Sequence, residues 1–180
     1  VEDQPLAQVD CLDFMSGKGA LRKAMLRHGL VAVRLDRKYT PYHDMTSDDG
    51  RRTSLVALRR LIGLAWLAYE CTTWVWVGRT QAGGHSDIEG NDTPGVIEAS
   101  TVRDFVVSMC LVASWSSREF IIEQPCLALV HLTLAFAAVL RIAGTSSITL
   151  DHGLFAHDPT EQVEAHGHAA VVDGVVGGHP

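Results

Sequence analysis

The stretch CLDFMSGKGALRKAMLRHGLVAVRLD, residues 11–36, decides the fold that the sequence predicts. It starts with a short apolar run that ends at Asp13 and then passes through a Gly-Lys-Gly turn. Apolar side chains at helical spacing follow the turn, and Gly29 interrupts them before an alternating run that leads to Asp36. The stretch therefore predicts a strand at 8–14, a helix at 20–28 and a second strand at 31–35.

The rest of the chain continues this alternation of strands and helices. An extended piece is expected around His43 and Asp44, and a loop is expected over 78–97, which is rich in Gly, Asp, Asn and Thr. The expected strands are 64–68, 120–122 and 147–150. Three further helices are expected: one that begins near Ser47, one at about 97–115, and one from Pro125 to about Ile142. This order predicts an α/β fold, a Rossmann-like, doubly wound and mostly parallel sheet with helices on both faces.

The length of 180 residues is that of one domain. We expect an α/β domain over residues 1–150, followed at 151–180 by a His- and Gly-rich extension that forms an irregular tail or an edge strand. Five of the nine histidines lie in this extension. Their spacing matches no zinc pattern, so no metal site is expected.

Composition and charge limit the classes of function. The net charge of −6 argues against unaided binding of nucleic acid, because that affinity comes mostly from Lys and Arg that neutralise phosphates. The most apolar stretch, 126–140, is too short to span a bilayer. The four cysteines lack the spacing of metal ligands, so we expect a reducing compartment, either the cytoplasm or a plastid after removal of a leader.

The carboxyl ends of the predicted strands carry most of the side chains suited to chemistry. In open α/β sheets these ends meet along one edge, and ligands bind there. We therefore expect the residues at the strand ends to lie along a single rim of the sheet. They are the segment 13–19 and then Asp36, Asp44, Glu70, Cys71 and Glu123.

Three short motifs, in this order, resemble those of a known family. LDFMSGKGAL supplies Asp13, Phe14, Gly17 and Gly19 of an Asp-x-Phe-x-Gly-x-Gly pattern, CTTWVWVGR begins at Cys71, and IIEQP contains Glu123. With this layout the chain resembles divergent class I S-adenosylmethionine-dependent methyltransferase-like domains, nearest the cytosine-C5 DNA methyltransferase branch and its degenerate algal relatives. The resemblance covers about residues 8–160.

The resemblance implies S-adenosylmethionine as the cofactor, held by Asp13, Gly17, Gly19, Asp36 and Asp44. The two glycines allow a tight turn beside the amino-acid moiety, and the N-terminus of the following helix favours its carboxylate. Asp36 matches the family's acid for the ribose, and Asp44 matches an acid on the adenine side. Taken alone, the same residues also fit a tight turn and a strand-end cap.

The resemblance assigns catalysis to Cys71 as nucleophile and to Glu123 as the acid that engages the base. The rest of that machinery departs from the family. The Pro-Cys pair is absent, and the negative charge of Glu70 next to Cys71 disfavours a thiolate. The later arginine-containing motif and a target-recognition domain are also missing. These departures predict that the chain is not a DNA methyltransferase.

Two hypotheses for function follow. The favoured one is a pseudoenzyme, a methyltransferase-like fold reused as a non-catalytic scaffold or accessory subunit of a larger assembly. Residues 105–143 contain only four charged residues, which predicts a protein partner on this apolar second half. The algal resemblance implies a chloroplast photosynthetic membrane complex, joined peripherally without a transmembrane helix. The alternative is an S-adenosylmethionine-binding methyltransferase acting on a small molecule, a protein or a nucleobase, with Glu70, Asp44 or Glu123 as the base.

Overall fold

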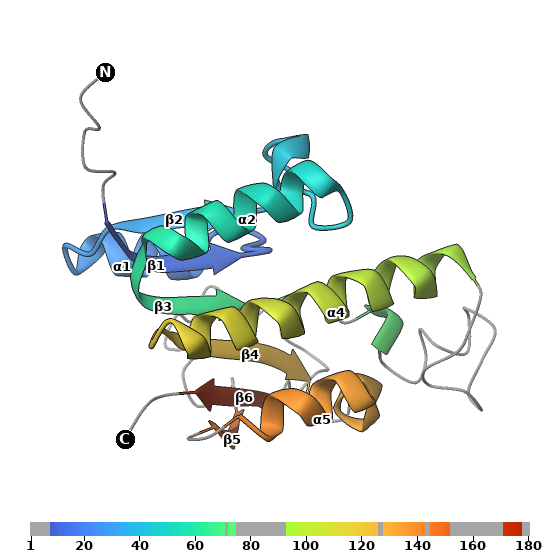
Figure 1. The fold of residues 1–180 in the computed structure, drawn as a ribbon. Helices are drawn as coiled ribbons and strands as arrows, with labels where there is room; N and C mark the ends of the chain where they lie inside the picture. The colour runs from blue at the N-terminus through green and yellow to red at the C-terminus, as the bar shows by residue number, and fades with distance from the viewer. Residues whose placement is uncertain are drawn as a thin grey trace, which may run out of the picture.

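The computed structural model describes residues 8–70, 72–74, 93–125, 128–142, 145–151 and 171–177. The opening β-α-β unit is confirmed, with strand β1 at Val9–Phe14, helix α1 at Ala20–Arg27 and strand β2 at Ala32–Leu35. β1 pairs in parallel with β2 on one side and with strand β3, Leu61–Leu67, on the other (Figure 1). β1 is therefore an interior strand, and its side chains are buried on both faces although two of them are aspartates, Asp10 and Asp13, with only Asp10 partly exposed.

Between β2 and β3 the chain forms two helices. The extended piece expected around His43 and Asp44 is instead a 3-10 helix, η1, at Pro41–His43. Proline suits the first position of a helical turn, and the side chain of Thr40 caps this one. Helix α2 covers Asp48–Arg60 and leads directly into β3, which therefore begins earlier than the sequence predicts.

The middle of the chain builds the next part of the sheet. Helix α4 starts before the predicted residue 97, because a proline at its first position favours a helix start there. Strand β4 is longer than the predicted 120–122, because it pairs on both sides, in parallel with β3 and antiparallel with a strand from the end of the chain. The bounds are Thr72–Trp74 for the 3-10 helix η2, Pro94–Trp115 for α4 and Glu119–Pro125 for β4.

The helix expected from Pro125 to Ile142 is divided at Thr133. The hydroxyl of Thr133 accepts a hydrogen bond from the Phe136 N–H and so begins a new helix. The strand expected at 147–150 is present and extends over more residues. The bounds are Leu129–Leu132 for the 3-10 helix η3, Leu134–Leu140 for helix α5 and Thr145–Asp151 for strand β5.

The C-terminal segment contributes strand β6, Val171–Gly177, to the interior of the sheet. The strand order is β2-β1-β3-β4-β6-β5, so β6 lies between β4 and β5, and β5 forms the edge. β6 is antiparallel to both neighbours, whereas β2, β1, β3 and β4 are parallel. The expected edge strand is thus an inner strand, and it shares one sheet with residues of the segment 1–150. The rest of 152–180 lies outside the described residues.

The predicted fold class is confirmed as α/β, with helices on both faces of the sheet. Figure 1 shows α2, α4 and α5 on one side of the sheet. Side chains alternate along a strand, so Leu12 and Phe14 of β1 face this side, and Asp13 faces the other. Asp13 accepts a hydrogen bond from the Arg22 N–H of α1, which places α1 on that other face. The main core fills the first side and includes Leu12, Phe14, Leu67, Val106, Met109, Phe120, Ile122 and Phe136.

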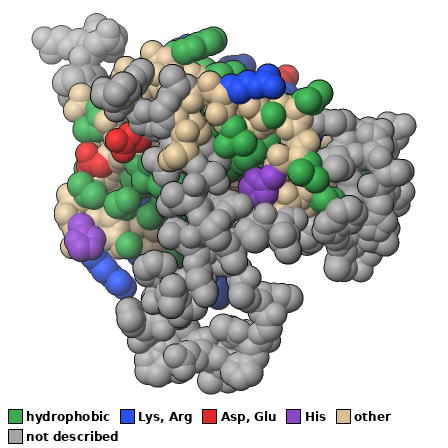
Figure 2. All heavy atoms as spheres, turned by 90° about the horizontal axis from the view of Figure 1, so that it is seen from below, with side chains coloured by type: hydrophobic (Ala, Val, Ile, Leu, Met, Phe, Trp, Pro, Cys, Tyr) green, Lys and Arg blue, Asp and Glu red, His purple; other side chains and the backbone are tan. Residues whose placement is uncertain are grey.

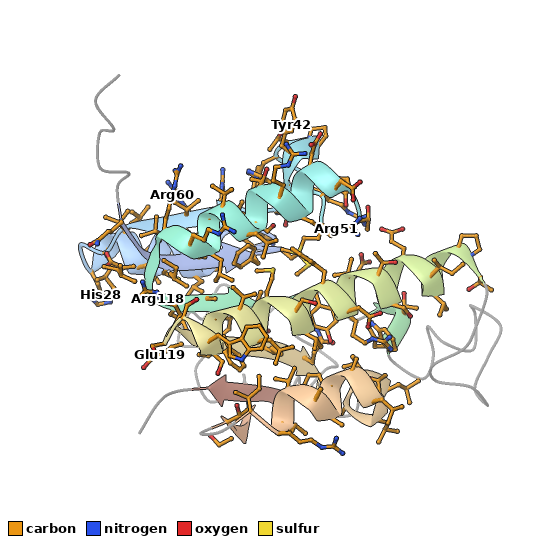
Figure 3. All side chains as sticks on the ribbon, viewed as in Figure 1. His28, Tyr42, Arg51, Arg60, Arg118 and Glu119 are labelled. Carbon is orange, nitrogen blue, oxygen red and sulfur yellow. The ribbon has the colours of Figure 1, made fainter. Side chains whose placement is uncertain are left out.

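The parallel strands all end on the same side of the molecule. Figure 3 shows Tyr42 and Arg51 toward this end of the sheet, and His28, Arg60, Arg118 and Glu119 at the opposite end. In the described part of the chain, no helix combines the length and the apolar character needed to cross a membrane.

Gly50 in the first turn of α2 determines how closely the loop before this helix can approach it. A Cβ atom at this position would lie 1.8 Å from the carbonyl oxygen of Asp44. The Gly50 N–H donates to the hydroxyl of Ser47, the N-cap residue, at 3.0 Å. The contact involves backbone on both sides, so no flexible side chain can move aside.

We expect Gly50→Ala to lower the free energy of unfolding by about 2 kcal/mol or more, because the loop or the helix must shift to admit the methyl group. Urea denaturation measures this loss. Gly95→Ala is the matched control, since a Cβ there meets open space near the start of α4. The control should stay within about 0.5 kcal/mol of the original chain, and an equal loss in both variants would contradict the packing explanation.

Candidate functional site

A cleft of about 420 Å³ opens at the carboxyl ends of β1, β2 and β3, beside the first half of α4. Its volume lies within the range of small-molecule sites. Its apolar lining comes from Met15, Met45, Ala68, Tyr69, Ala99 and Val102. Its polar lining includes four carboxylates, from Asp36, Asp44, Glu70 and Glu98, together with Arg37 and His43. With His43 neutral, these side chains give the cleft a formal charge of −3.

Asp36 joins the loop after β1 to the loop after β2. One oxygen of its carboxylate accepts the Gly17 N–H at 2.9 Å, and the other accepts the Lys38 N–H at 3.0 Å. The Tyr39 hydroxyl also donates to the carbonyl oxygen of Gly17 at 2.9 Å. Both backbone polar groups of Gly17 are therefore used within the protein. Of the residues that the methyltransferase resemblance assigns to the cofactor, Asp36 and Asp44 line the cleft, whereas Gly17 and Gly19 do not.

Positive φ angles explain why the loop after β1 contains two glycines. Gly17 has φ +49° and Gly19 has φ +70°, a region that other residues rarely adopt. Met15, which lines the cleft, also has a positive φ of 54°. A non-glycine residue in this conformation is uncommon, and the hydrogen bond from its N–H to the Leu35 carbonyl helps to hold it there.

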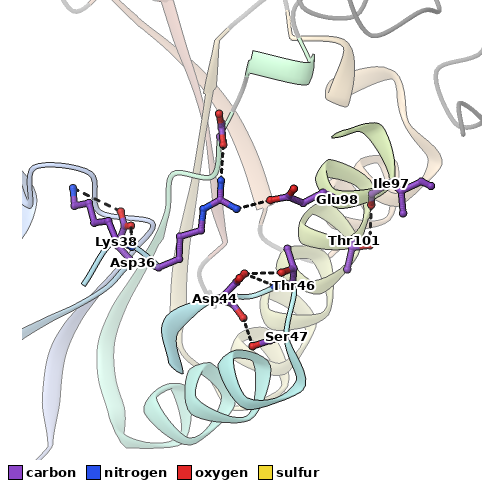
Figure 4. Close-up of polar contacts among 10 residues, drawn as sticks. Asp36, Lys38, Asp44, Thr46, Ser47, Ile97, Glu98 and Thr101 are labelled. Atoms are coloured by element: carbon purple, nitrogen blue, oxygen red, sulfur yellow. Dashed lines mark hydrogen bonds and ion pairs between the residues drawn. The ribbon is translucent and has the colours of Figure 1, made fainter. Parts of the chain in front are cut away.

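Asp44 belongs to a compact turn between η1 and α2 (Figure 4). One oxygen of its carboxylate accepts both the backbone N–H of Thr46, at 3.0 Å, and the Thr46 hydroxyl, at 2.7 Å. Burial acts to raise the pKa of Asp44, but these hydrogen bonds and the positive charge of Arg37 outweigh it and lower the pKa. Asp44 therefore stays ionised at neutral pH, and it faces the cleft as a hydrogen-bond acceptor.

Arg37 connects two walls of the cleft. Its guanidinium contacts the carboxylate of Glu98 on α4 and lies 3.5 Å from the carboxylate of Glu70, which follows β3 (Figure 4). The hydrogen bond to Glu98 raises the pKa of Arg37 above its ordinary value. All three side chains are about half exposed or more. The cleft thus has an ion-pair bridge at a solvent-accessible position.

Asp13 lies at the same end of the sheet, on the opposite face from the cleft. It is 2% exposed, and it accepts the Arg22 N–H in the first turn of α1 at 3.3 Å. Burial raises the pKa of Asp13, the Arg22 N–H opposes this, and the charges of Glu123 and Asp36 raise it further. The helix N-terminus that was expected to favour a cofactor carboxylate is therefore already next to a carboxylate of the chain.

Glu123 also faces away from the cleft. It accepts a hydrogen bond from the indole N–H of Trp66 on β3 at 3.1 Å. Its neighbour Gln124, which is 1% exposed, points to the other face and donates to the carbonyl oxygen of Tyr69 at 2.8 Å. Gln124, rather than Glu123, thus supports the segment that carries Glu70 into the cleft.

The remaining catalytic candidate, Cys71, lies outside the described residues. Trp74 is fully buried, with the guanidinium of Arg103 5.3 Å from its ring centre. Trp74 therefore packs in the core and does not fill the cleft. In the described part of the chain, no group of three or more His, Cys, Asp and Glu side chains is placed to hold a metal ion.

Sequence reasoning identified the acids at the strand ends but missed the residues that complete the cleft. Arg37 directly follows the predicted strand-end acid Asp36, so its place at the same end of the sheet could have been predicted from the sequence. Glu98 comes from a helix, and Gln124 acts through its side-chain amide, so strand-end reasoning had no means to find them. Their roles depend on how α4 and β4 pack beside β3.

Comparisons of the chain with protein-family models, with curated proteins and with solved structures gave no match. The geometry of the cleft is therefore the basis for assigning a function.

We expect Asp36→Asn to speed hydrogen exchange at the Gly17 or the Lys38 amide, because an amide side chain offers one oxygen where the carboxylate offers two. The loss of one hydrogen bond to a charged group should cost about 1.5 to 3 kcal/mol of stability. Exchange measured by NMR, together with urea denaturation, tests this. Lys38→Ala is the control, since it keeps the backbone N–H and removes only the exposed ammonium, with its ion pair to Asp36 at 3.9 Å and its contact with the Tyr39 ring. Unchanged exchange at both amides in Asp36→Asn would refute this role of Asp36.

Asp13→Asn should change how stability depends on pH. The folded chain holds the Asp13 proton more tightly than the unfolded chain, so the stability from the protonated acid is present at low pH and is lost as pH rises through the raised pKa. Asparagine does not titrate. The free energy of unfolding of the variant, relative to that of the original chain, should therefore be greater at pH 7 than at about pH 3.5, which lies below the ordinary pKa of an aspartate. Urea denaturation at both pH values measures this, and a difference in the opposite direction would show that Asp13 is stabilising as a carboxylate.

Proposed function

We propose that the chain is a methyltransferase-like domain that binds S-adenosylmethionine in the acid-lined cleft at the carboxyl ends of β1, β2 and β3. The observation that carries the proposal is the combination of a cleft of about 420 Å³ with four carboxylates and one guanidinium. S-adenosylmethionine combines ribose hydroxyls, which donate to carboxylates, with a positively charged sulfonium. Both features suit a cleft of this charge.

The described side chains fit this ligand by their chemistry. The Asp44 carboxylate has one oxygen beyond the one that Thr46 engages, and Asp36 keeps lone pairs beyond its two backbone hydrogen bonds. Met15, Met45 and Ala68 offer apolar surface for a flat base. When bound, S-adenosylmethionine supplies an electrophilic methyl group. The acids of the cleft hold and orient the ligand and exclude anionic competitors.

The position of Glu123 argues for an acceptor other than a cytosine base. A carboxylate on the far face of the sheet, hydrogen-bonded to Trp66, does not reach an acceptor in the cleft. Glu70 lines the cleft, so it is the proposed base for the acceptor, which is a small molecule or a protein group.

The accessory-subunit hypothesis remains a second candidate, because exposed apolar side chains lie in the second half of the chain. Trp115 is 81% exposed, Leu132 is 67% exposed and Leu134 is 78% exposed. Figure 2 shows numerous hydrophobic side chains and few charged ones among the coloured atoms of the face viewed from below. Docking on a plastid photosynthetic complex is the setting that the algal resemblance implies for this candidate.

Isothermal titration with S-adenosylmethionine tests the proposal. We expect saturable binding, weakened about tenfold in Asp44→Asn, because a hydrogen bond to a charged acceptor contributes roughly 1.5 kcal/mol. Asp49→Asn is the matched control, since it removes an exposed carboxylate of α2 that does not line the cleft. Absence of binding at millimolar ligand would overturn the cofactor proposal and leave the accessory-subunit candidate.

A further inference from the structure

Arg37 lies between two of the carboxylates that line the cleft. Its guanidinium lies between Glu98 on α4 and Glu70 after β3, and all three residues line the cleft. Among the described residues that line the cleft, Arg37 is the one that carries a fixed positive charge. The protein thus neutralises part of its own acidic lining with an internal cation.

The bridge that Arg37 makes can be opened at little cost. The side chains of Arg37, Glu70 and Glu98 are 54%, 71% and 48% exposed. Exposed ion pairs contribute little to stability, because water screens the charges and the long side chains lose freedom when they pair. Loss of the bridge should therefore leave the fold intact, and its main effect should be on the charges that a ligand meets.

We propose that Arg37 sets the charge selectivity of the cleft, by occupying the position between Glu70 and Glu98 that the cationic group of a ligand would otherwise take. Arg37 repels a ligand cation directly and also engages the two carboxylates that would attract it. The cleft therefore binds a cationic ligand less tightly than its acid content alone would allow. Glu70 and Glu98 act in the opposite direction.

This inference rests on the proposed function and adds a specific role for one residue. S-adenosylmethionine and its demethylated product differ by one methyl group and one positive charge, on the sulfonium. The ratio of their two dissociation constants therefore isolates the response of the cleft to that charge. Because Arg37 weakens the binding of the positively charged S-adenosylmethionine more than that of its product, it lowers the preference of the cleft for S-adenosylmethionine.

The experiment measures both dissociation constants by isothermal titration for the original chain and for Arg37→Gln, Arg37→Lys and Glu98→Gln. In Arg37→Gln we expect the preference for S-adenosylmethionine over its product to rise roughly three- to tenfold, the effect of removing one unit charge at several ångströms in a partly hydrated site. Arg37→Lys keeps the charge and should retain the original ratio. Glu98→Gln should lower the ratio.

Arg51→Gln is the control for removing an arginine from an ion pair elsewhere. Arg51 pairs with Asp48 on α2 at 2.6 Å and does not line the cleft, so the ratio should not change. Circular dichroism confirms that each variant is folded. If the original chain binds both ligands and Arg37→Gln leaves their ratio unchanged, or weakens both equally, the role of Arg37 is refuted and the proposed function stands. If no variant binds S-adenosylmethionine, both proposals fail.

Discussion

The hydrogen bonds that the Asp36 carboxylate accepts from the Gly17 and Lys38 N–H groups are the interaction on which the site depends. They join the loop after β1 to the loop after β2, at the adjacent carboxyl ends of these two parallel strands. The left-handed glycines allow the first loop to turn back far enough to meet the acid. With both loops held, Met15 and Arg37 take their places in the lining of the cleft. A strand-end acid that fits a cofactor role therefore also has a structural role.

The alternation of side chains along each strand separates the acids of this rim into two groups. Asp36 and Glu70 follow strands β2 and β3 and line the cleft together with Asp44 from the turn before α2, while Asp13 and Glu123 lie within strands and point to the face of α1. The two groups are still close enough for Asp36 and Glu123 to raise the pKa of Asp13. Proximity along one rim is thus not the same as a shared site. This separation makes the cleft suited to binding and leaves the cytosine chemistry of the resembled family without its acid.

The cleft carries a negative formal charge, and we propose that Arg37 moderates the attraction that this charge would exert on a cationic ligand. An acidic cleft in a chain of net charge −6 concentrates cations by the local field and by the field of the whole protein. The apolar side chains Met45, Ala68 and Val102 add the contact surface that a flat organic ligand needs. Trp74 is buried in the core and does not line the cleft.

The sequence by itself determined the first β-α-β unit, the α/β class and the strand-end positions of Asp36 and Glu70, because these follow from hydrophobic periodicity and from glycine and proline at local turns. Boundaries shifted where local capping decided them, as at Thr40 and Thr133. Tertiary structure alone decided that residues 171–177 enter the sheet beside β4, that Glu123 lies inside a strand, and that Glu98 and Gln124 support the cleft. The physical reason is that strand pairing and helix packing join residues far apart along the chain, and no local pattern records which partner each will meet.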